Sequence, residues 1–326
     1  MPKGPSFGKY LLRRIPQGIP LILVVISVNF VLIHAAPGDP AEILAGELPP
    51  PEFIERIRRE FGLDKPLHEQ YFSYLQNVIG GNLGYSYFYR RPVLEIILER
   101  APATVLLMAT QLLFASLVGI VFGVFASRRP YSKLDNFVST TALMTYCFPI
   151  FFLGTVLLLV FGLHLGWFPS IGMSTIEVRM NPLARIIDIM RHLILPSLTL
   201  GLSHTALIFR LTRSSMIEVL GLDFITTARV KGVKERFVIF RHGLRNALLP
   251  IVTVIGMDAG TMIAGAVMTE TIFSWPGIGR LLYDSIFARD YPVIMGIFVI
   301  VSISVIVANL MTDVICAYLD PKIRYE

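Results

Sequence analysis

The stretch Asp223–Pro250 reads DFITTARVKGVKERFVIFRHGLRNALLP and lies between two long apolar segments. In a protein that is 54% hydrophobic, this stretch carries the basic residues Arg229, Lys231, Lys234, Arg236, Arg241 and Arg245. A few residues would suffice to connect two membrane spans, whereas this stretch is long and has a helical pattern. It therefore predicts a structured element that a partner outside the membrane can hold.

Composition assigns the chain to the polytopic α-helical membrane proteins, an all-α fold class. Only 16% of its 326 residues are charged, against about 25% in soluble domains. Long uncharged runs form helices that cross the bilayer, because a helix satisfies its own backbone hydrogen bonds. The net charge of +6 comes from residues in the connecting loops, which indicates contact with membrane lipid and not with nucleic acid.

Six segments are long and apolar enough to form transmembrane helices. They are Ile15–Ala36, Ala101–Ser127, a third that begins after Asp135 and ends near Pro169, Leu193–Phe209, Ala247–Thr269 and Tyr291–Thr312. Lys and Arg gather in the N-terminal segment, in the loop after the second span, around 223–250 and near the C-terminus. The short loops on the opposite side hold Arg179, Arg185, Arg191, Arg280 and Arg289. The positive-inside rule therefore predicts that both termini are cytoplasmic.

A long external loop, Pro37–Arg100, separates the first two spans. Its sequence predicts short helices at Glu52–Phe61, Leu67–Ile79 and Val93–Arg100. A surface for a partner and a simple lid are both reasonable interpretations of this loop. We divide the chain into residues 1–100, with the first span and the loop, and a core of residues 101–326. The core contains five spans and a cytoplasmic coupling loop at about 210–246.

Within the opening stretch, residues 223 to 232 have the signals of a short helix. Asp223 is a good N-cap, and Gly232 is a suitable C-terminal stop. Arg229 and Lys231 fall in the last turn, where cations interact favourably with the helix dipole.

One face of this predicted helix combines an aromatic residue with small residues. Phe224, Thr227, Ala228 and Lys231 recur at the i, i+3, i+4 and i+7 positions. Such a face can enter a groove on a rigid partner, with Phe224 as the anchor and the small side chains allowing close approach. A basic helix that lies on anionic lipid is the alternative that composition leaves open.

The residues around this helix carry a resemblance to a known family. Thr226–Thr227–Ala228 is followed by Gly232, and Arg241–His242 and Arg245–Asn246 precede Ala247–Pro250. This pattern resembles the cytoplasmic-loop signature of ATP-binding-cassette (ABC) importer permeases, although the glutamate of the general form is absent. The longer form seen here is similar to the first permease subunit of the dipeptide, oligopeptide and nickel branch. Further similar segments lie along the chain: Pro37–Pro40, Phe61–Asp64, Gly81–Gly84, Arg91–Val93, Glu270–Gly279, Ala288–Pro292 and Leu319–Tyr325.

The resemblance implies a type I ABC importer permease fold in the cytoplasmic membrane. It implies a second homologous permease, two cytoplasmic ABC ATPase subunits and an extracytoplasmic solute-binding protein as partners. The residues expected to couple to an ATPase are Asp223, Phe224, Thr226, Thr227, Ala228, Arg229, Lys231 and Gly232. ATP and Mg²⁺ are expected on the ATPases, because this sequence has no G-x-x-x-x-G-K-[ST] motif. The chain itself is expected to bind no cofactor or metal and to catalyse no reaction.

The resemblance favours di- or oligopeptides as the transported solute. Nickel complexes, glutathione and oligosaccharides are the alternatives within the same family. The sequence of this chain does not discriminate among them, because specificity rests largely with the external binding protein.

Asp258 interrupts the fifth predicted span and is the candidate residue for the translocation path. A carboxylate near the middle of a span costs about 2.5–3.5 kcal/mol on insertion scales, so it is expected to face protein or water. There it could attract the amino group of a peptide, or pair with a polar residue of a neighbouring helix. An ion-coupled secondary transporter that uses Asp258 is the alternative function, and its uptake would follow the proton gradient instead of ATP.

Overall fold

The computed structural model describes residues 18, 20–31, 34, 50–60, 64–86, 88–175 and 181–319, without the side chains of residues 53, 57, 60, 257–265 and 316–319. The described chain is almost entirely helical. The elements are α3 (Pro51–Glu60), α4 (Leu67–Ile79), β1 (Tyr85–Ser86), β2 (Arg91–Pro92), α5 (Val93–Ser127), α6 (Lys133–Cys147), α7 (Ile150–Leu157), the π-helix η1 (Leu158–His164), α8 (Pro182–Leu220), α9 (Asp223–Val230), α10 (Glu235–Phe237), the π-helix η2 (Val238–Leu244), α11 (Arg245–Ile272), α12 (Ile278–Phe287) and α13 (Tyr291–Leu319). An apolar helix, Pro20–Val31, precedes them.

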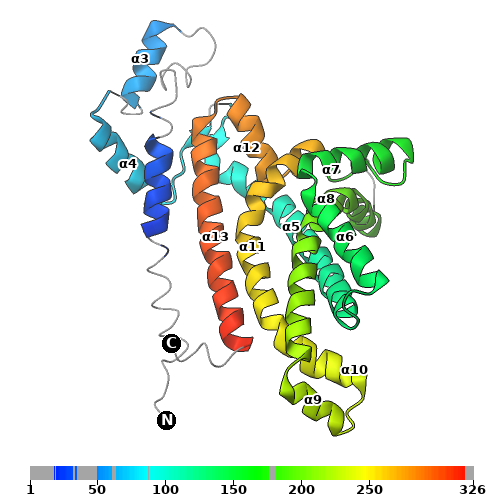
Figure 1. Ribbon diagram of the computed structural model, residues 1–326. Helices are drawn as coiled ribbons and strands as arrows, with labels where there is room; N and C mark the ends of the chain where they lie inside the picture. The colour runs from blue at the N-terminus through cyan, green and yellow to red at the C-terminus, as the bar shows by residue number, and fades with distance from the viewer. Residues whose placement is uncertain are drawn as a thin grey trace, which may run out of the picture.

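The helices extend between two ends of the molecule (Figure 1). α9 and α10 lie at one end, which we call the α9 end, and α3, α4 and α12 lie at the other, the α12 end. α11 and α13 pack side by side between the two ends. The described end of α13 is near the α9 end.

Within the described residues, the helical segments long and apolar enough to cross a membrane are Val93–Ser127, Pro182–Leu220, Glu235–Gly256 and Tyr291–Ile315. They contain or overlap the predicted second, fourth, fifth and sixth spans. The first predicted span is described in part, as Pro20–Val31. The prediction of a separate helix at Val93–Arg100 is wrong, because α5 runs without a break through residue 100 and past Pro102. The helices predicted around residues 52–61 and 67–79 are present as α3 and α4.

The predicted third span is not one continuous helix. α6 and the following α7–η1 pair meet at an angle of 104°. Pro149 lies at the break and lacks a backbone N–H, and a proline also disfavours helical backbone in the residue before it. Phe148 accordingly has an extended conformation with ψ 133°. The expected single span is therefore corrected to a bent pair of helices.

The most extensive helix pair among the described elements is α5 with α8. A Cβ on Gly123 would come within 2.6 Å of the Thr212 Cβ, and one on Gly119 would also clash with α8. Only glycine permits this approach of the two backbones, and the four-residue spacing of Gly119 and Gly123 places both on the side of α5 that packs against α8. Gly256 packs against α13 in the same way.

A hydrophobic cluster at the α12 end joins the first described helix to the core. Ile26 is buried with Val93, Ile97 and Val293, which come from α5 and α13. Nearby, the Ser27 hydroxyl and the Tyr71 hydroxyl are 2.7 Å apart and share a hydrogen bond. These contacts hold the Pro20–Val31 helix against both α4 and the helical core.

Candidate functional site

The helix α9 begins at Asp223, one residue earlier than predicted. Leu222 occupies the N-cap position without a side-chain capping hydrogen bond, and Asp223 is the first helical residue. The prediction that Asp223 is the N-cap is therefore wrong. Its carboxylate still lies in the first turn, where a negative charge interacts favourably with the helix dipole.

The C-terminal end of α9 is closed by a glycine, as predicted. Gly232 has φ +75°, in the left-handed region that favours glycine. The Gly232 N–H donates to the Arg229 carbonyl at 2.9 Å, and the Val233 N–H donates to the Ala228 carbonyl at 3.1 Å. This pair of hydrogen bonds is a Schellman motif, which satisfies carbonyls at the helix end and fixes where the chain turns.

Two contacts fix α9 to the residues that follow it. The Ile225 side chain is 0% exposed, and α9 packs against η2. The Arg229 guanidinium donates twice to the Glu235 carboxylate, at 2.9 and 3.2 Å. The hydrogen bonds that Arg229 donates to Glu235 raise the pKa of Arg229 above its usual value. Sequence reasoning missed both Ile225 and Glu235, because the buried side of an eight-residue helix depends on what it packs against.

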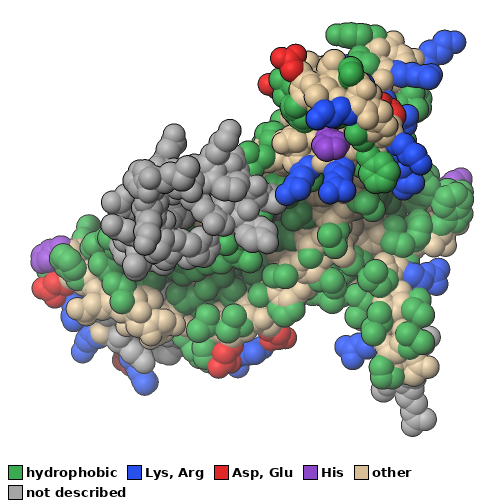
Figure 2. Space-filling model, turned by 90° about the horizontal axis from the view of Figure 1, so that it is seen from below, with side chains coloured by type: hydrophobic (Ala, Val, Ile, Leu, Met, Phe, Trp, Pro, Cys, Tyr) green, Lys and Arg blue, Asp and Glu red, His purple; other side chains and the backbone are tan. Residues whose placement is uncertain are grey.

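The outward side of α9 is largely uncovered by other described residues. Phe224 is 43% exposed, Thr227 and Lys231 are exposed, and Ala228 is half-buried. This exposed side contains the face predicted from sequence. Seen from the α9 end, the surface shows more Lys and Arg side chains than Asp and Glu side chains (Figure 2). Phe224 is therefore an exposed apolar side chain in basic surroundings. The helix that carries it, α9, is fixed to the rest of the chain.

Arg213 and Asp135 form an ion pair between α8 and α6. The Arg213 Nε and Nη2 atoms donate to the two carboxylate oxygens of Asp135 at 2.6 and 2.7 Å. The Tyr131 N–H donates to the same carboxylate at 2.7 Å, and the Asp135 side chain is 1% exposed. This bidentate pair fixes the first turn of α6 against α8, at the end of α6 that is opposite to the bend at Pro149.

We expect Asp135→Ala to lower the stability of the protein by about 2 kcal/mol. Breaking a buried pair is costly because it leaves one charge without a partner, although Arg213 is 23% exposed and can partly reach solvent. Thermal melting of the purified protein in detergent measures the change. The double variant Asp135→Ala with Arg213→Met should melt higher than Asp135→Ala alone, because it removes both charges. Equal melting of the single variant and the unchanged protein would contradict a stabilising pair.

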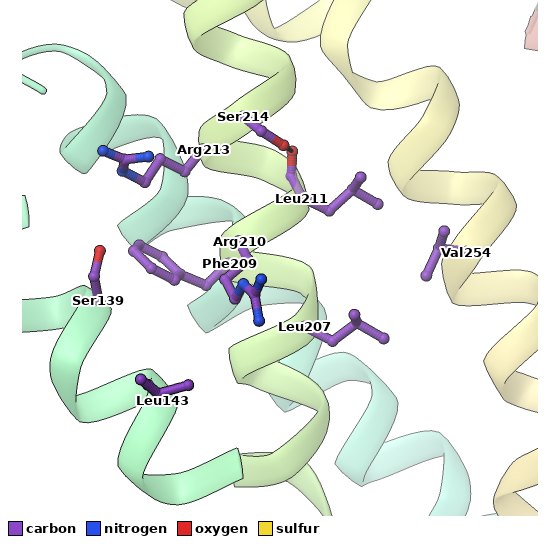
Figure 3. A pocket seen from close by; sticks show the side chains of 9 residues that line it. All are labelled: Ser139, Leu143, Leu207, Phe209, Arg210, Leu211, Arg213, Ser214 and Val254. Carbon is purple, nitrogen blue, oxygen red and sulfur yellow. Dashed lines mark hydrogen bonds between the residues drawn. The ribbon is translucent and has the colours of Figure 1, made fainter. Parts of the chain in front are cut away.

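A cavity of about 690 Å³ lies between α6, α8 and α11 (Figure 3). α8 provides most of the lining, α6 adds Ser139 and Leu143, and α11 adds Val254. The lining is mostly apolar and contains two arginines, Arg210 and Arg213. Arg213 is held by Asp135, so the two arginines differ in the charge that they offer to the cavity.

Asp258 lies in α11, one turn beyond Val254, and its side chain is outside the described residues. Among the described side chains of α11, a different acid is buried. Glu270 is 0% exposed, accepts a hydrogen bond from the Thr104 hydroxyl at 2.8 Å and accepts another from the Arg280 N–H at 3.0 Å. Sequence reasoning noted the Glu270–Gly279 segment as similar to the family but did not recognise the acid as buried. The available signal was an acid at the end of an apolar run followed by Pro-Gly-x-Gly.

Comparisons with known proteins agree with this architecture. Residues 119–325 match the family described as the inner membrane component of binding-protein-dependent transport systems. Residues 7–108 match the family described as the N-terminal part of the membrane component of such systems. The chain belongs to the ABC importer permeases of the peptide and nickel transport family. Permeases of this kind are membrane subunits of transport systems and are not themselves catalytic.

Named relatives of this permease match it over nearly its whole length. It is 41% identical over 317 residues to the oligopeptide transport system permease protein AppB of Bacillus subtilis (strain 168), covering 97% of this chain and 99% of the relative. It is 39% identical over 317 residues to the glutathione transport system permease protein GsiC of Escherichia coli (strain K12), with the same coverage. A solved structure of the MetNI methionine ABC transporter, in an inward-facing conformation, matches with a TM-score of 0.57 and 16% identity, covering 70% of this chain and 97% of that chain. The last comparison shows that the fold is shared.

Proposed function

We propose that this permease is a subunit of an ATP-driven importer of di- or oligopeptides in the cytoplasmic membrane. It has six transmembrane helices in the type I arrangement, and a second homologous permease completes the translocation path. Two cytoplasmic ABC ATPase subunits supply the driving force, and an extracytoplasmic binding protein delivers the solute. ATP and Mg²⁺ bind to the ATPases, and this chain holds no cofactor.

The observation that carries this proposal is an exposed aromatic side chain on an anchored helix. Ile225 and Arg229 fix α9 to its own chain, while Phe224 stays 43% exposed. A large apolar side chain on a rigid support suits a hot spot in a partner groove. A helix fixed in this way also transmits a rigid-body displacement from an ATPase to the spans. The proposed contact residues are Asp223, Phe224, Thr226, Thr227, Ala228, Arg229, Lys231 and Gly232.

We propose that both termini are cytoplasmic, and the arrangement of the ends supports this for the C-terminal side of α13. α9 and the described end of α13 are at the same end of the molecule, and α3, α4 and α12 are at the other (Figure 1). In this orientation the basic coupling segment faces the cytoplasm, as the positive-inside rule requires. We propose residues 1–100 and the permease core of residues 101–326 as two functional regions. They are not two structural domains, because α5 crosses residue 100 without a break.

Reconstitution tests the proposal directly. The permease would be incorporated into liposomes with its second permease and the two ATPases, and uptake of radiolabelled peptides would be measured with the binding protein outside. The proposal predicts uptake that requires ATP on the ATPase side and persists when a protonophore removes the proton gradient. Uptake that follows the gradient and ignores ATP would establish the secondary-transporter alternative instead.

Glutathione is a second candidate solute because a relative at 39% identity is named as a glutathione transport permease. It is itself a small peptide with free carboxylates, so the same site chemistry would serve it. Competition between unlabelled glutathione and labelled tripeptides in the uptake assay ranks the two solutes.

We propose that Asp258 lines the translocation path and attracts the amino group of the solute. The replacement Asp258→Asn should reduce uptake of peptides with a free amino terminus about tenfold relative to their N-acetylated forms, since a charge-assisted hydrogen bond is lost. The ratio of the two uptake rates, compared with the unchanged protein, is the measurement. An unchanged ratio with unchanged transport would remove Asp258 from the path.

A further inference from the structure

Arg210 differs from the other basic residues near the α9 end. Counted by sequence, it falls at the start of the predicted coupling loop at about 210–246. In the structure it is part of α8, ten residues before the helix ends at Leu220. At 1.5 Å per residue, that position is about 15 Å along the helix from its end. Arg210 therefore lies within the long helix α8 and not in the loop that follows it.

The side chain of Arg210 lines the cavity between α6, α8 and α11 (Figure 3). Most of its neighbours there are apolar, including Leu143, Leu207 and Val254. Arg210 is exposed, and no carboxylate among the described residues lies within ion-pair distance of its guanidinium. Its guanidinium therefore presents an uncompensated positive charge to the cavity, and this charge attracts an anion.

The second arginine of the cavity does not offer a free charge. Both carboxylate oxygens of Asp135 accept hydrogen bonds from Arg213, at 2.6 and 2.7 Å. The Asp135 charge therefore offsets the Arg213 charge, and the net positive charge of the lining residues belongs to Arg210. The guanidinium N–H groups of Arg210 are also available to donate two parallel hydrogen bonds to a carboxylate.

We infer that Arg210 binds the carboxylate of the transported solute at this cavity and thereby selects for solutes that carry one. The inference rests on the proposed function, and it names the chemistry by which this subunit would contribute to selectivity. A volume of about 690 Å³ is within the range of sites for small-molecule ligands. The relatives named for oligopeptide and glutathione transport are consistent with it, since both kinds of solute have a carboxylate.

The test compares two solutes that differ in that carboxylate. A tripeptide library and its C-terminally amidated counterpart would be supplied to the full reconstituted complex, and uptake would be quantified by mass spectrometry. For each protein variant the measured quantity is the ratio of free-acid uptake to amide uptake. Dividing the ratio of the variant by that of the unchanged protein cancels the preference of the binding protein, which is the same in both.

Arg210→Gln is expected to lower this ratio about tenfold, because the charge-assisted contact to the carboxylate is lost. Arg210→Lys keeps the charge and should retain most of the preference, and Arg210→Glu should favour the amides. Arg185→Gln is the matched control, since Arg185 is an exposed arginine on the same helix near its other end. It should leave the ratio unchanged. Detergent melting and basal ATPase activity report whether each variant is folded and assembled.

Three outcomes would overturn the inference. If Arg210→Gln reduces free-acid and amide uptake equally, Arg210 serves the helix packing or the second permease and not the carboxylate. An effect that disappears when anionic lipid is left out of the liposomes would assign Arg210 to a lipid headgroup. Arg210→Gln without any change in uptake would remove it from the path. If the unchanged complex imports neither library, the proposed peptide function itself fails, and this result is distinguishable because it precedes any comparison of variants.

Discussion

Replacing Phe224 by alanine should reduce ATP-driven uptake by roughly 30-fold or more while leaving the protein folded. Truncation of an aromatic hot spot at an interface costs about 2 kcal/mol or more, which corresponds to a factor of about 30 in affinity. Phe224 is 43% exposed in this chain, so its removal creates no cavity in the permease itself. The expected loss therefore falls on the contact with the ATPase and not on stability.

The measurements for Phe224→Ala are uptake in the reconstituted complex and co-purification of the ATPase subunits with the permease. Val230→Ala is the matched control, because Val230 is 82% exposed on α9 but lies away from the Phe224 face. We expect this control to transport normally. Equal losses in both variants would show that α9 as a whole, and not the Phe224 face, is required. Normal uptake and normal ATPase retention in Phe224→Ala would contradict the coupling role of this face.

Glu270→Ala is expected to destabilise the protein by about 3–5 kcal/mol, the largest stability effect that we predict. The Glu270 carboxylate accepts hydrogen bonds from the Thr104 hydroxyl of α5 and from the Arg280 N–H of α12. The Thr104 hydroxyl in turn accepts a hydrogen bond from the Ile278 N–H at 2.8 Å. These contacts satisfy two of the N–H groups at the start of α12 and tie α12 to both α5 and α11. Removing a buried acceptor leaves its donors unpaired, at about 1–3 kcal/mol for each, and also leaves a cavity.

Glu270→Gln separates the role of the hydrogen bonds from that of the charge. The glutamine keeps the shape and one acceptor oxygen, so this variant should lose much less stability than Glu270→Ala. Glu218→Ala provides the control, since Glu218 is exposed on α8. Thermal melting in detergent and the yield of monodisperse protein are the measurements. Melting of Glu270→Ala at the temperature of the unchanged protein would show that the network does not stabilise the fold.

The glycine at residue 277 also depends on Glu270. A Cβ at Gly277 would clash with the Glu270 carboxylate, and one at Gly279 would clash with the backbone of Val267. The Pro-Gly-x-Gly part of the segment is thus explained by the close approach of the chain to a buried acid. Local propensity gave no indication of this, because the acid and the first donor, Thr104, are 166 residues apart.

The sequence predicted well those features that depend on neighbouring residues. The apolar runs indicated which segments form long helices, and a glycine at residue 232 indicated where α9 ends. The predictions were wrong where the outcome depends on local backbone conformation. Leu222 and not Asp223 is the N-cap of α9, and the third predicted span bends at Pro149.

By itself, the sequence determined the membrane class of this protein, most of its long helices and its membership of the importer permeases, because hydrophobic length and local motifs are properties of consecutive residues. The tertiary structure alone decided which side chains meet. It paired Arg213 with Asp135, so that among the described lining residues Arg210 carries the charge without a partner. It also buried Ile225 and left Phe224 exposed on α9, which packs against η2. The physical reason is that burial and charge compensation depend on what a side chain contacts, and those contacts come from residues distant in the chain.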